Sequence, residues 1–292
     1  MTSNNAYIVS AVRTAGGKKN GKLSGWHPAD IGAKVLDELV HQTGIDPNDI
    51  DDVISKAQEA GVVRIYLPNI DHTSIDSMLE LENKYPNYCE VMMGLHPCSV
   101  KQDFEKELYL VEDWLNKRKF RGVGEIGTDL YWDKTFWNQQ QEAFNIQLDF
   151  AKKFKIPAII HCRDSIDETI EMVELKKSDN LTGIFHCFTG TVEQANRIID
   201  LGFYISFSGI VTFKSAKDLQ ETCRQVPLER MLIETDSPYL APMPHRGKTN
   251  EPAWVSHVAG FIADLKGVSV ETIAEHTTNN FFQCFQVNRE LS

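Results

Sequence analysis

Short apolar segments rich in β-branched residues alternate with amphipathic helical segments along most of the chain, and this alternation restricts the possible folds most strongly. Seven such segments after residue 55 are predicted as strands: Val63 to Leu67, Val91 to Leu95, Gly122 to Ile126, Pro157 to His161, Gly183 to His186, Phe203 to Ser206 and Met231 to Thr235. Several of the helical segments between them begin after Ser, Thr or Asp, which can cap a helix. Parallel strands joined by crossover helices are therefore expected.

The number of strands indicates a closed barrel. An eight-unit (β/α)8 barrel typically takes about 250 residues, and the chain after residue 54 supplies roughly 240 with seven predicted strands. The missing strand has one candidate, the segment AYIVSAV at residues 6–12, which precedes a Gly- and Lys-rich loop and a helical segment. We therefore expect an α/β fold of the TIM-barrel type, with an open doubly wound sheet as the alternative.

Composition excludes several functional classes. A chain of 292 residues that is 42% hydrophobic can fill a large core, and its formal charge of -11 opposes non-specific adhesion to nucleic acid. A polyanionic substrate would therefore need a local cationic site or metal ions. The six cysteines form no CxxC pair, and no apolar run approaches the roughly 20 residues that span a bilayer. We expect a reduced cytoplasmic protein with no disulfide and no membrane association.

The predicted strands end in residues that can bind metal ions. These are His96, Glu125, His161, His186, and Glu234 with Asp236. Arg163 and Asp164 follow shortly after His161. The C-terminal strand ends of barrel enzymes form the active-site face. One histidine near a strand is more often structural, but His or carboxylate at five successive strand ends is hard to explain by packing. The nitrogen and oxygen donors suit Zn²⁺, Mn²⁺ or Mg²⁺, so the residues alone predict metal-assisted hydrolysis at the barrel mouth.

The motifs at these positions resemble the TatD family of metal-dependent deoxyribonucleases, a branch of the amidohydrolase superfamily. From about Asp52 to the C-terminus, the family's order and spacing are matched by GLHP, GEIGTDLYWDKT, HCRD, FHCFTG, YISFSGIVTFK, IETDSPYLAP and RGKTNEP. The resemblance implies a TIM barrel with two adjacent divalent ions bridged by Glu125. His161 and His186 would also hold one ion, whereas Asp236 and a His-x-His pair at the end of the first strand would hold the other.

The same resemblance implies an activity and a set of roles. The activity is 3′ to 5′ exonuclease action on DNA, with a broader hydrolase capacity in some members. Glu125 and Asp236 would be the catalytic residues, and Asp236 could take the proton of the attacking water. His96 and Arg163 resemble substrate-binding residues. The chain departs from the family at Thr128, where an apolar residue is usual.

A cationic patch is expected on the loop after the last strand. The sequence PHRGKTNEP supplies His245, Arg246 and Lys248, which could bind a phosphate backbone despite the net negative charge. The alternative is an ordinary solvated loop.

The N-terminal segment lacks the His-x-His pair and has a resemblance of its own. No such pair occurs in the sequence, and its position is occupied by residues 6–13. Residues 1–54 resemble the N-terminus of a thiolase, an acetyl-CoA acetyltransferase, and are expected to replace the first β/α unit of a barrel formed by residues 55–292. Thiolase catalysis needs a nucleophilic Cys with a distal His and Cys in Gly-rich contexts, and Cys89, in NYCEV, lacks them. Acyl transfer and CoA binding are therefore not expected.

The missing pair predicts a weakened second metal site. One ion can still be held by Glu125, His161 and His186, while the other keeps only Glu125 and Asp236. Hydrolysis is then expected to be impaired. The alternative is a folded metal-binding protein with little or no catalysis.

Overall fold

The structure is a computed structural model that describes residues 49–287. Its strands are β1 (Ile65–Pro68), β2 (Cys89–Met92), β3 (Val123–Asp129), β4 (Ala158–Arg163), β5 (Gly183–Phe185), β6 (Tyr204–Phe207) and β7 (Met231–Ile233). Each overlaps one of the strands predicted from the sequence, with ends that differ by up to three residues. The proposed eighth strand at residues 6–12, and most of the thiolase-like segment, lie outside the described residues.

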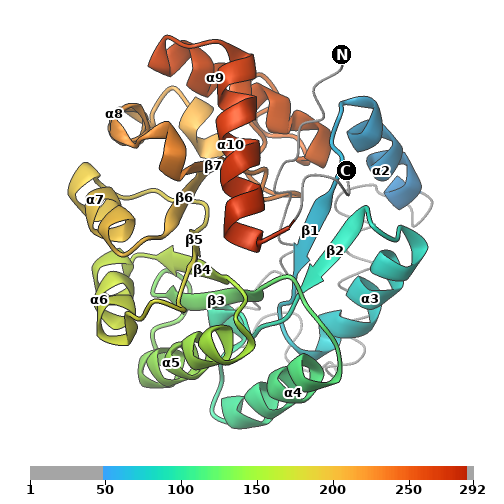
Figure 1. Cartoon of the computed structure of the whole chain (residues 1–292), viewed down its shortest axis with the longest axis vertical. Helices are drawn as coiled ribbons and strands as arrows, with labels where there is room; N and C mark the ends of the chain where they lie inside the picture. Colours follow the sequence, from blue (N-terminus) through green and yellow to red (C-terminus); the bar gives the residue numbers. More distant parts are fainter. Residues whose placement is uncertain (1–48, 288–292) are drawn as a thin grey trace.

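The strands are parallel and pair in chain order. β1 pairs with β2, β3 to β7 form a continuous series, and a parallel bridge between Met93 and Val123 joins the two groups. Figure 1 shows the strands at the centre and the helices around them. The fold is therefore α/β and of the TIM-barrel type, as the alternation of segments predicts.

Helices flank the strands along the chain. They are α2 (Asp49–Glu59), α3 (Ile75–Lys84), α4 (Phe104–Lys117), α5 (Trp137–Phe154), α6 (Ile166–Lys176), α7 (Val192–Asp200), α8 (Lys217–Gln225), α9 (Val255–Lys266) and α10 (Val270–Phe285). Capping residues define the ends of several helices. Thr191 and Gln194 form a capping box at the start of α7, and Gly267 ends α9 in the left-handed conformation.

Alternation along the strands separates the core into two layers. Ile159 and Ile160 are neighbours in β4, yet they pack in different clusters, because successive side chains of a strand point to opposite faces. The inner cluster contains Tyr66, Met92, Ile159, Ile184, Tyr204 and Leu232 from the strands, together with Phe281, Cys284 and Phe285 from α10. α10 contacts β7 and closes this apolar floor of the barrel (Figure 1). The outer cluster lies between the strands and the surrounding helices.

Polar residues form the next layer on the inner face. Two positions beyond the apolar floor, the strands present His161, His186, Ser206 and Glu234. All four are buried. The sheet therefore brings His161, His186 and Glu234 together with Ser206 at the C-terminal ends of the strands.

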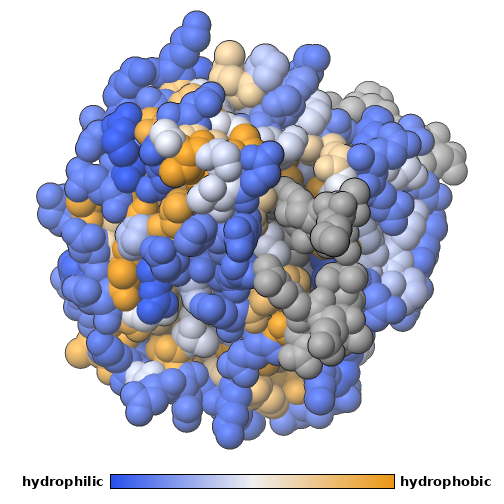
Figure 2. All heavy atoms as spheres, turned by 45° about the horizontal axis from the view of Figure 1, so that its top comes forward, coloured by the Kyte–Doolittle hydropathy of each residue, from blue (hydrophilic) through white to orange (hydrophobic). Residues whose placement is uncertain are grey.

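The surface shows no large apolar face in the view of Figure 2, where hydrophilic residues dominate and apolar ones form small groups. Within residues 49–287, no helix has the length and apolarity that a membrane crossing requires.

Candidate metal centre

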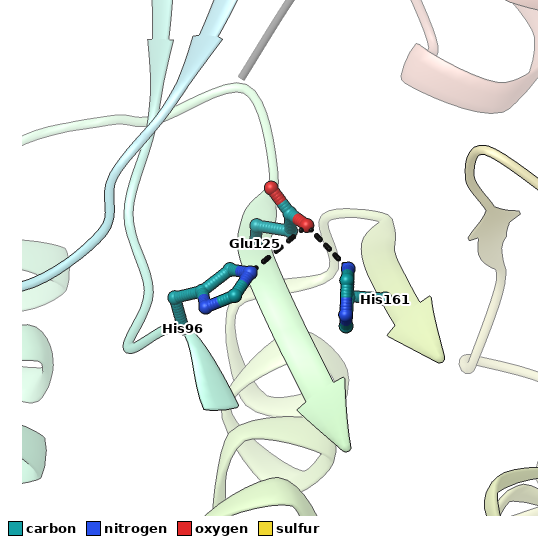
Figure 3. Close-up of side chains that lie close together, drawn as sticks. All are labelled: His96, Glu125 and His161. Atoms are coloured by element: carbon teal, nitrogen blue, oxygen red, sulfur yellow. Dashed lines mark ion pairs between the residues drawn. The ribbon is translucent and has the colours of Figure 1, made fainter. Parts of the chain in front are cut away.

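Glu125, in β3, is the centre of a buried polar cluster. Its Oε1 atom lies 2.6 Å from Nε2 of His186, 2.9 Å from Nδ1 of His161 and 3.2 Å from Nε2 of His96. Figure 3 shows the rings of His96 and His161 on two sides of the carboxylate. All four side chains are almost fully buried. Burial alone would raise the pKa of Glu125, but the three histidines outweigh it and hold the pKa well below its usual range. The carboxylate is therefore ionised.

The outer nitrogens of two of these histidines face further carboxylates. Nε2 of His161 lies 3.0 Å from Oδ2 of Asp129, and Nδ1 of His186 lies 3.4 Å from Oε1 of Glu234. Ser206 donates its hydroxyl to Oε2 of Glu234 at 2.6 Å. Such carboxylate–histidine pairs orient imidazoles that bind metals and increase their basicity. The imidazoles of His161 and His186, oriented in this way, also face one oxygen of Glu125. The three side chains make a donor set that fits a divalent ion.

A glycine permits the close approach of β3 and β4 at this point. Gly127 pairs with His161 in the sheet and has φ +136°, and a Cβ at this position would overlap the carbonyl oxygen of His161. The next residue is Thr128, the departure from the family pattern. Its hydroxyl lies 2.7 Å from those of Ser165 and Thr169, so its polar group is satisfied although it is buried.

His96 is held in a specific tautomer. Its Nδ1 atom accepts a hydrogen bond from the backbone N–H of Cys98 at 3.1 Å, and the amide of Gln147 binds both backbone groups of Leu95. A neutral ring that accepts at Nδ1 carries its proton on Nε2, the atom that faces Glu125. His96, Glu125 and His161 present ligand atoms within 4.8 Å of one another. The tautomer nevertheless suits His96 to donate to an anionic oxygen rather than to bind a metal.

Asp236 follows β7 and is half-buried. Burial raises its pKa, and although His186 opposes this shift, Glu125 and Glu234 add to it and raise the pKa to about 7. These charges act on Asp236 because it lies close to the Glu125 cluster. Its backbone has φ +57°, a conformation that Asp adopts more readily than most residues.

Arg163 lies at the end of β4 beside two exposed aromatic rings. Its guanidinium carbon is 3.6 Å from the ring centroid of Tyr131 and 5.5 Å from that of Trp132. The two rings meet edge to face and are 52% and 60% exposed. Cation–π contact therefore positions Arg163, a predicted substrate-binding residue, at the mouth.

The predicted cationic patch does not form one cluster around Glu125. The ring of His245 stacks on Trp254 at 4.0 Å, and its Nε2 atom lies 3.1 Å from Nε2 of His257. Burial and the neighbouring His245 lower the pKa of His257. The described contacts of His245 are thus made with residues of the C-terminal region rather than with the metal-binding cluster.

The two other residues of the patch remain near the surface. The guanidinium of Arg246 lies over the ring of Phe213 at 4.5 Å, and Lys248 is exposed. Their loop is anchored by Asn250, whose amide donates to the carbonyl oxygens of Thr235 and Tyr239 at 2.7 Å each. Both cations are available to solvent on an anchored loop.

Asp129 and Ser206 are site residues that the sequence reasoning did not select, and Glu234 was noted without a role. A signal for Asp129 exists, because Glu125, Gly127 and Asp129 alternate along β3 and share one face of the strand. Ser206 and Glu234 meet because of the register between β6 and β7, which the sequence does not specify directly.

Comparison with known proteins identifies the family. The model of the family described as "TatD related DNase" matches residues 36–286. The chain belongs to the TatD family. It is 40% identical over 266 residues to the uncharacterised metal-dependent hydrolase YcfH of Escherichia coli K12, a match that covers 87% of this chain and 96% of that protein. It is 37% identical over 240 residues to the uncharacterised metal-dependent hydrolase YabD of Bacillus subtilis 168, with 82% and 94% covered.

A solved structure agrees with the TatD assignment. The crystal structure of the TatD homologue YJJV from Escherichia coli K12 superposes with a TM-score of 0.78 and 28% identity, covering 82% of this chain and 93% of that one. The protein is therefore a TatD-like metal-dependent hydrolase with a TIM-barrel-type fold.

The N-terminal segment has a second match. The model of the thiolase N-terminal domain matches residues 6–62, so residues 36–62 are matched by both family models. The thiolase resemblance is thus found where the sequence motifs place it. The exact boundary between the two parts stays a prediction.

Proposed function

We propose that this TatD protein hydrolyses phosphodiester bonds and removes nucleotides from the 3′ ends of DNA. The observation that supports the proposal is the meeting of three imidazoles at one buried carboxylate oxygen of Glu125. Glu125, His161 and His186 would hold a divalent ion, with Asp236 close to the second position. Divalent ions bound there supply activation of water and neutralisation of phosphate charge.

Asp236 has the properties of a general base. A pKa of about 7 lies near neutral pH, where a carboxylate is basic enough to take a proton from water and is still partly ionised. A bound cation would lower this pKa and increase the ionised fraction. Asp236 is therefore the residue that we assign to proton removal.

His96 and Arg163 would bind the substrate phosphate. Nε2 of His96 faces Oε1 of Glu125 at 3.2 Å, and a phosphate oxygen bound beside that carboxylate would accept its proton. Arg163 offers a planar cationic donor at the mouth, held against Tyr131. Arg246 and Lys248 add positive charge on the loop after β7, which favours a polyanion locally although the chain carries -11 overall.

The absent His-x-His pair supports reduced activity. The second ion position would keep Glu125 and Asp236 but lose two neutral nitrogen ligands, and loss of ligands weakens both affinity and catalysis. The same observation favours the second candidate, a metal-binding protein with little or no catalysis.

Counting the bound metal tests the weakened site. After dialysis against Mn²⁺ and removal of free ion, elemental analysis should find about one ion per chain, and Glu125→Ala should bind none tightly. Two fully occupied ions per chain would contradict the proposed loss.

A nuclease assay separates the two candidate functions. DNA labelled at the 5′ end should be shortened stepwise in Mg²⁺ or Mn²⁺, whereas DNA labelled at the 3′ end should release labelled mononucleotide first. Glu125→Ala, checked for its fold by circular dichroism, gives the background. Metal binding with no cleavage above that background would favour the non-catalytic candidate, and internal cleavage would reject the exonuclease assignment.

A further inference from the structure

His245 and His257 form a pair of imidazoles away from the Glu125 cluster. Their Nε2 atoms are 3.1 Å apart, and their ring centroids are 4.9 Å apart. His257 belongs to α9, and His245 lies on the loop between β7 and α9. The two donor nitrogens therefore converge from separate elements on one point.

We propose that His245 and His257 form a second binding site for a transition-metal ion such as Zn²⁺ or Cu²⁺. This site does not depend on the proposed nuclease activity.

The separation of the two nitrogens fits one ion. If each metal–nitrogen bond is about 2.05 Å, nitrogens 3.1 Å apart subtend about 98° at the metal. That angle lies between the ~90° of square-planar or octahedral ions and the ~109° of tetrahedral ones. In the metal-free chain, one ring donates its Nε2 proton to the other; when an ion binds, that ring would carry its proton on Nδ1 instead, so that both Nε2 atoms offer lone pairs to the ion.

Both ring positions are fixed without an ion. The ring of His245 stacks on Trp254 with an angle of 11° between the planes. Its backbone is held by bonds from its N–H to the carbonyl of Pro242 at 2.7 Å and from the N–H of Lys248 to its own carbonyl at 3.0 Å. α9 places the backbone of His257, and its ring is held by the contact with His245. A preorganised pair loses little conformational entropy when it binds an ion.

The site is open to solvent and selective in its chemistry. Both histidines are half-buried, so an ion can enter and water can complete its coordination. Imidazole ligands suit Zn²⁺, Cu²⁺ and Ni²⁺, whereas Mg²⁺ and Ca²⁺ prefer oxygen. An ion bound here would link the loop that carries Arg246 and Lys248 to α9.

A metal titration in a chain without the central imidazoles tests the site. In the His161→Ala/His186→Ala background, we expect one Zn²⁺ per chain by isothermal titration calorimetry. Adding His257→Gln should weaken that binding by at least about tenfold, because one of two protein ligands is lost. Adding His276→Gln, a half-exposed histidine of α10, should leave it unchanged. Absence of Zn²⁺ binding in the background chain, or equal binding after His257→Gln, would overturn the proposal.

A spectroscopic measurement on the otherwise unmodified chain covers the case in which the background variant does not fold. With two equivalents of Cu²⁺, electron paramagnetic resonance should show, besides the signal of an ion at the Glu125 cluster, a second species with hyperfine coupling to two ring nitrogens that is lost in both His245→Gln and His257→Gln. Retention of that species in either single variant would reject the pair as ligands.

Discussion

The imidazole of His161 bridges two carboxylates of the same strand, with Nδ1 2.9 Å from Oε1 of Glu125 and Nε2 3.0 Å from Oδ2 of Asp129. Both carboxylates belong to β3, and their spacing of four residues places them on one face. The orientation of His161 is thus fixed by its neighbours before an ion binds.

Asp129→Asn should weaken metal binding without unfolding the protein. The amide keeps the size of the side chain but removes the charge that orients and polarises His161, so we expect the affinity for Zn²⁺ or Mn²⁺ to fall by about 10- to 100-fold. Competition with a chromogenic chelator measures the change. Asp133→Asn, the same substitution at an exposed position of the next loop, should have no effect. Equal affinities of the two variants would show that Asp129 does not act on the metal.

Gly127→Ala should reduce both stability and metal affinity. The added methyl group overlaps the backbone of β4 at His161, and φ +136° is strained for Ala. Gly260→Ala is the matched control, because its site in α9 is open. There the change should stabilise the protein by about 0.5–1 kcal/mol. Chemical denaturation and the same metal titration measure both. A Gly127→Ala variant as stable as the unmodified chain would refute the close approach.

Metal binding at neutral pH should release protons from the chelator-treated protein. Burial alone lowers the pKa of His186, but Glu125 and Glu234 outweigh it and raise the pKa well above its ordinary value. The ring is therefore protonated at pH 7 in the metal-free chain, whereas a metal ligand must be neutral. Calorimetry in buffers of different ionisation enthalpy should give at least about one proton per ion. A binding enthalpy independent of the buffer would contradict this.

Phe281→Ala should strongly destabilise the barrel. Phe281 is 1% exposed and packs edge to face on Tyr66 in the apolar floor, so its removal should cost about 3–5 kcal/mol in the free energy of unfolding. Val270→Ala, at an exposed position of the same helix, should change it by less than about 0.5 kcal/mol. Urea denaturation distinguishes them. A small effect at Phe281 would mean that α10 does not close the barrel.

Much of the described fold follows from the sequence, because periodicity and burial act locally. The seven strands after residue 55 were predicted from their apolar runs, and their ends correctly place His161 and His186 near Glu125. Contacts between side chains of different strands are harder to predict from the sequence. Ser206 reaches Glu234 through the register of β6 and β7, and a single sequence does not state the register of neighbouring strands.

The two cysteines next to the central histidines show where the alternation rule ends. Cys162, inside β4, is buried in the outer apolar cluster, as alternation predicts. Cys187 lies beyond the end of β5, has φ +46° and places its sulfur 3.2 Å from Oγ of Ser208. Cys187 is therefore not part of the outer apolar cluster, because the strand that would direct its side chain ends at Phe185.

The apolar floor beneath the histidines also determines how the cluster responds to charge. Tyr66, Phe281 and their neighbours keep water away from one side, so the charges above them are weakly screened. Groups coupled in this way titrate as a unit. A proton or a cation that binds to one member changes the charge state preferred by every other. The number of protons held in the barrel interior is thus set by the cluster as a whole and not by any single residue.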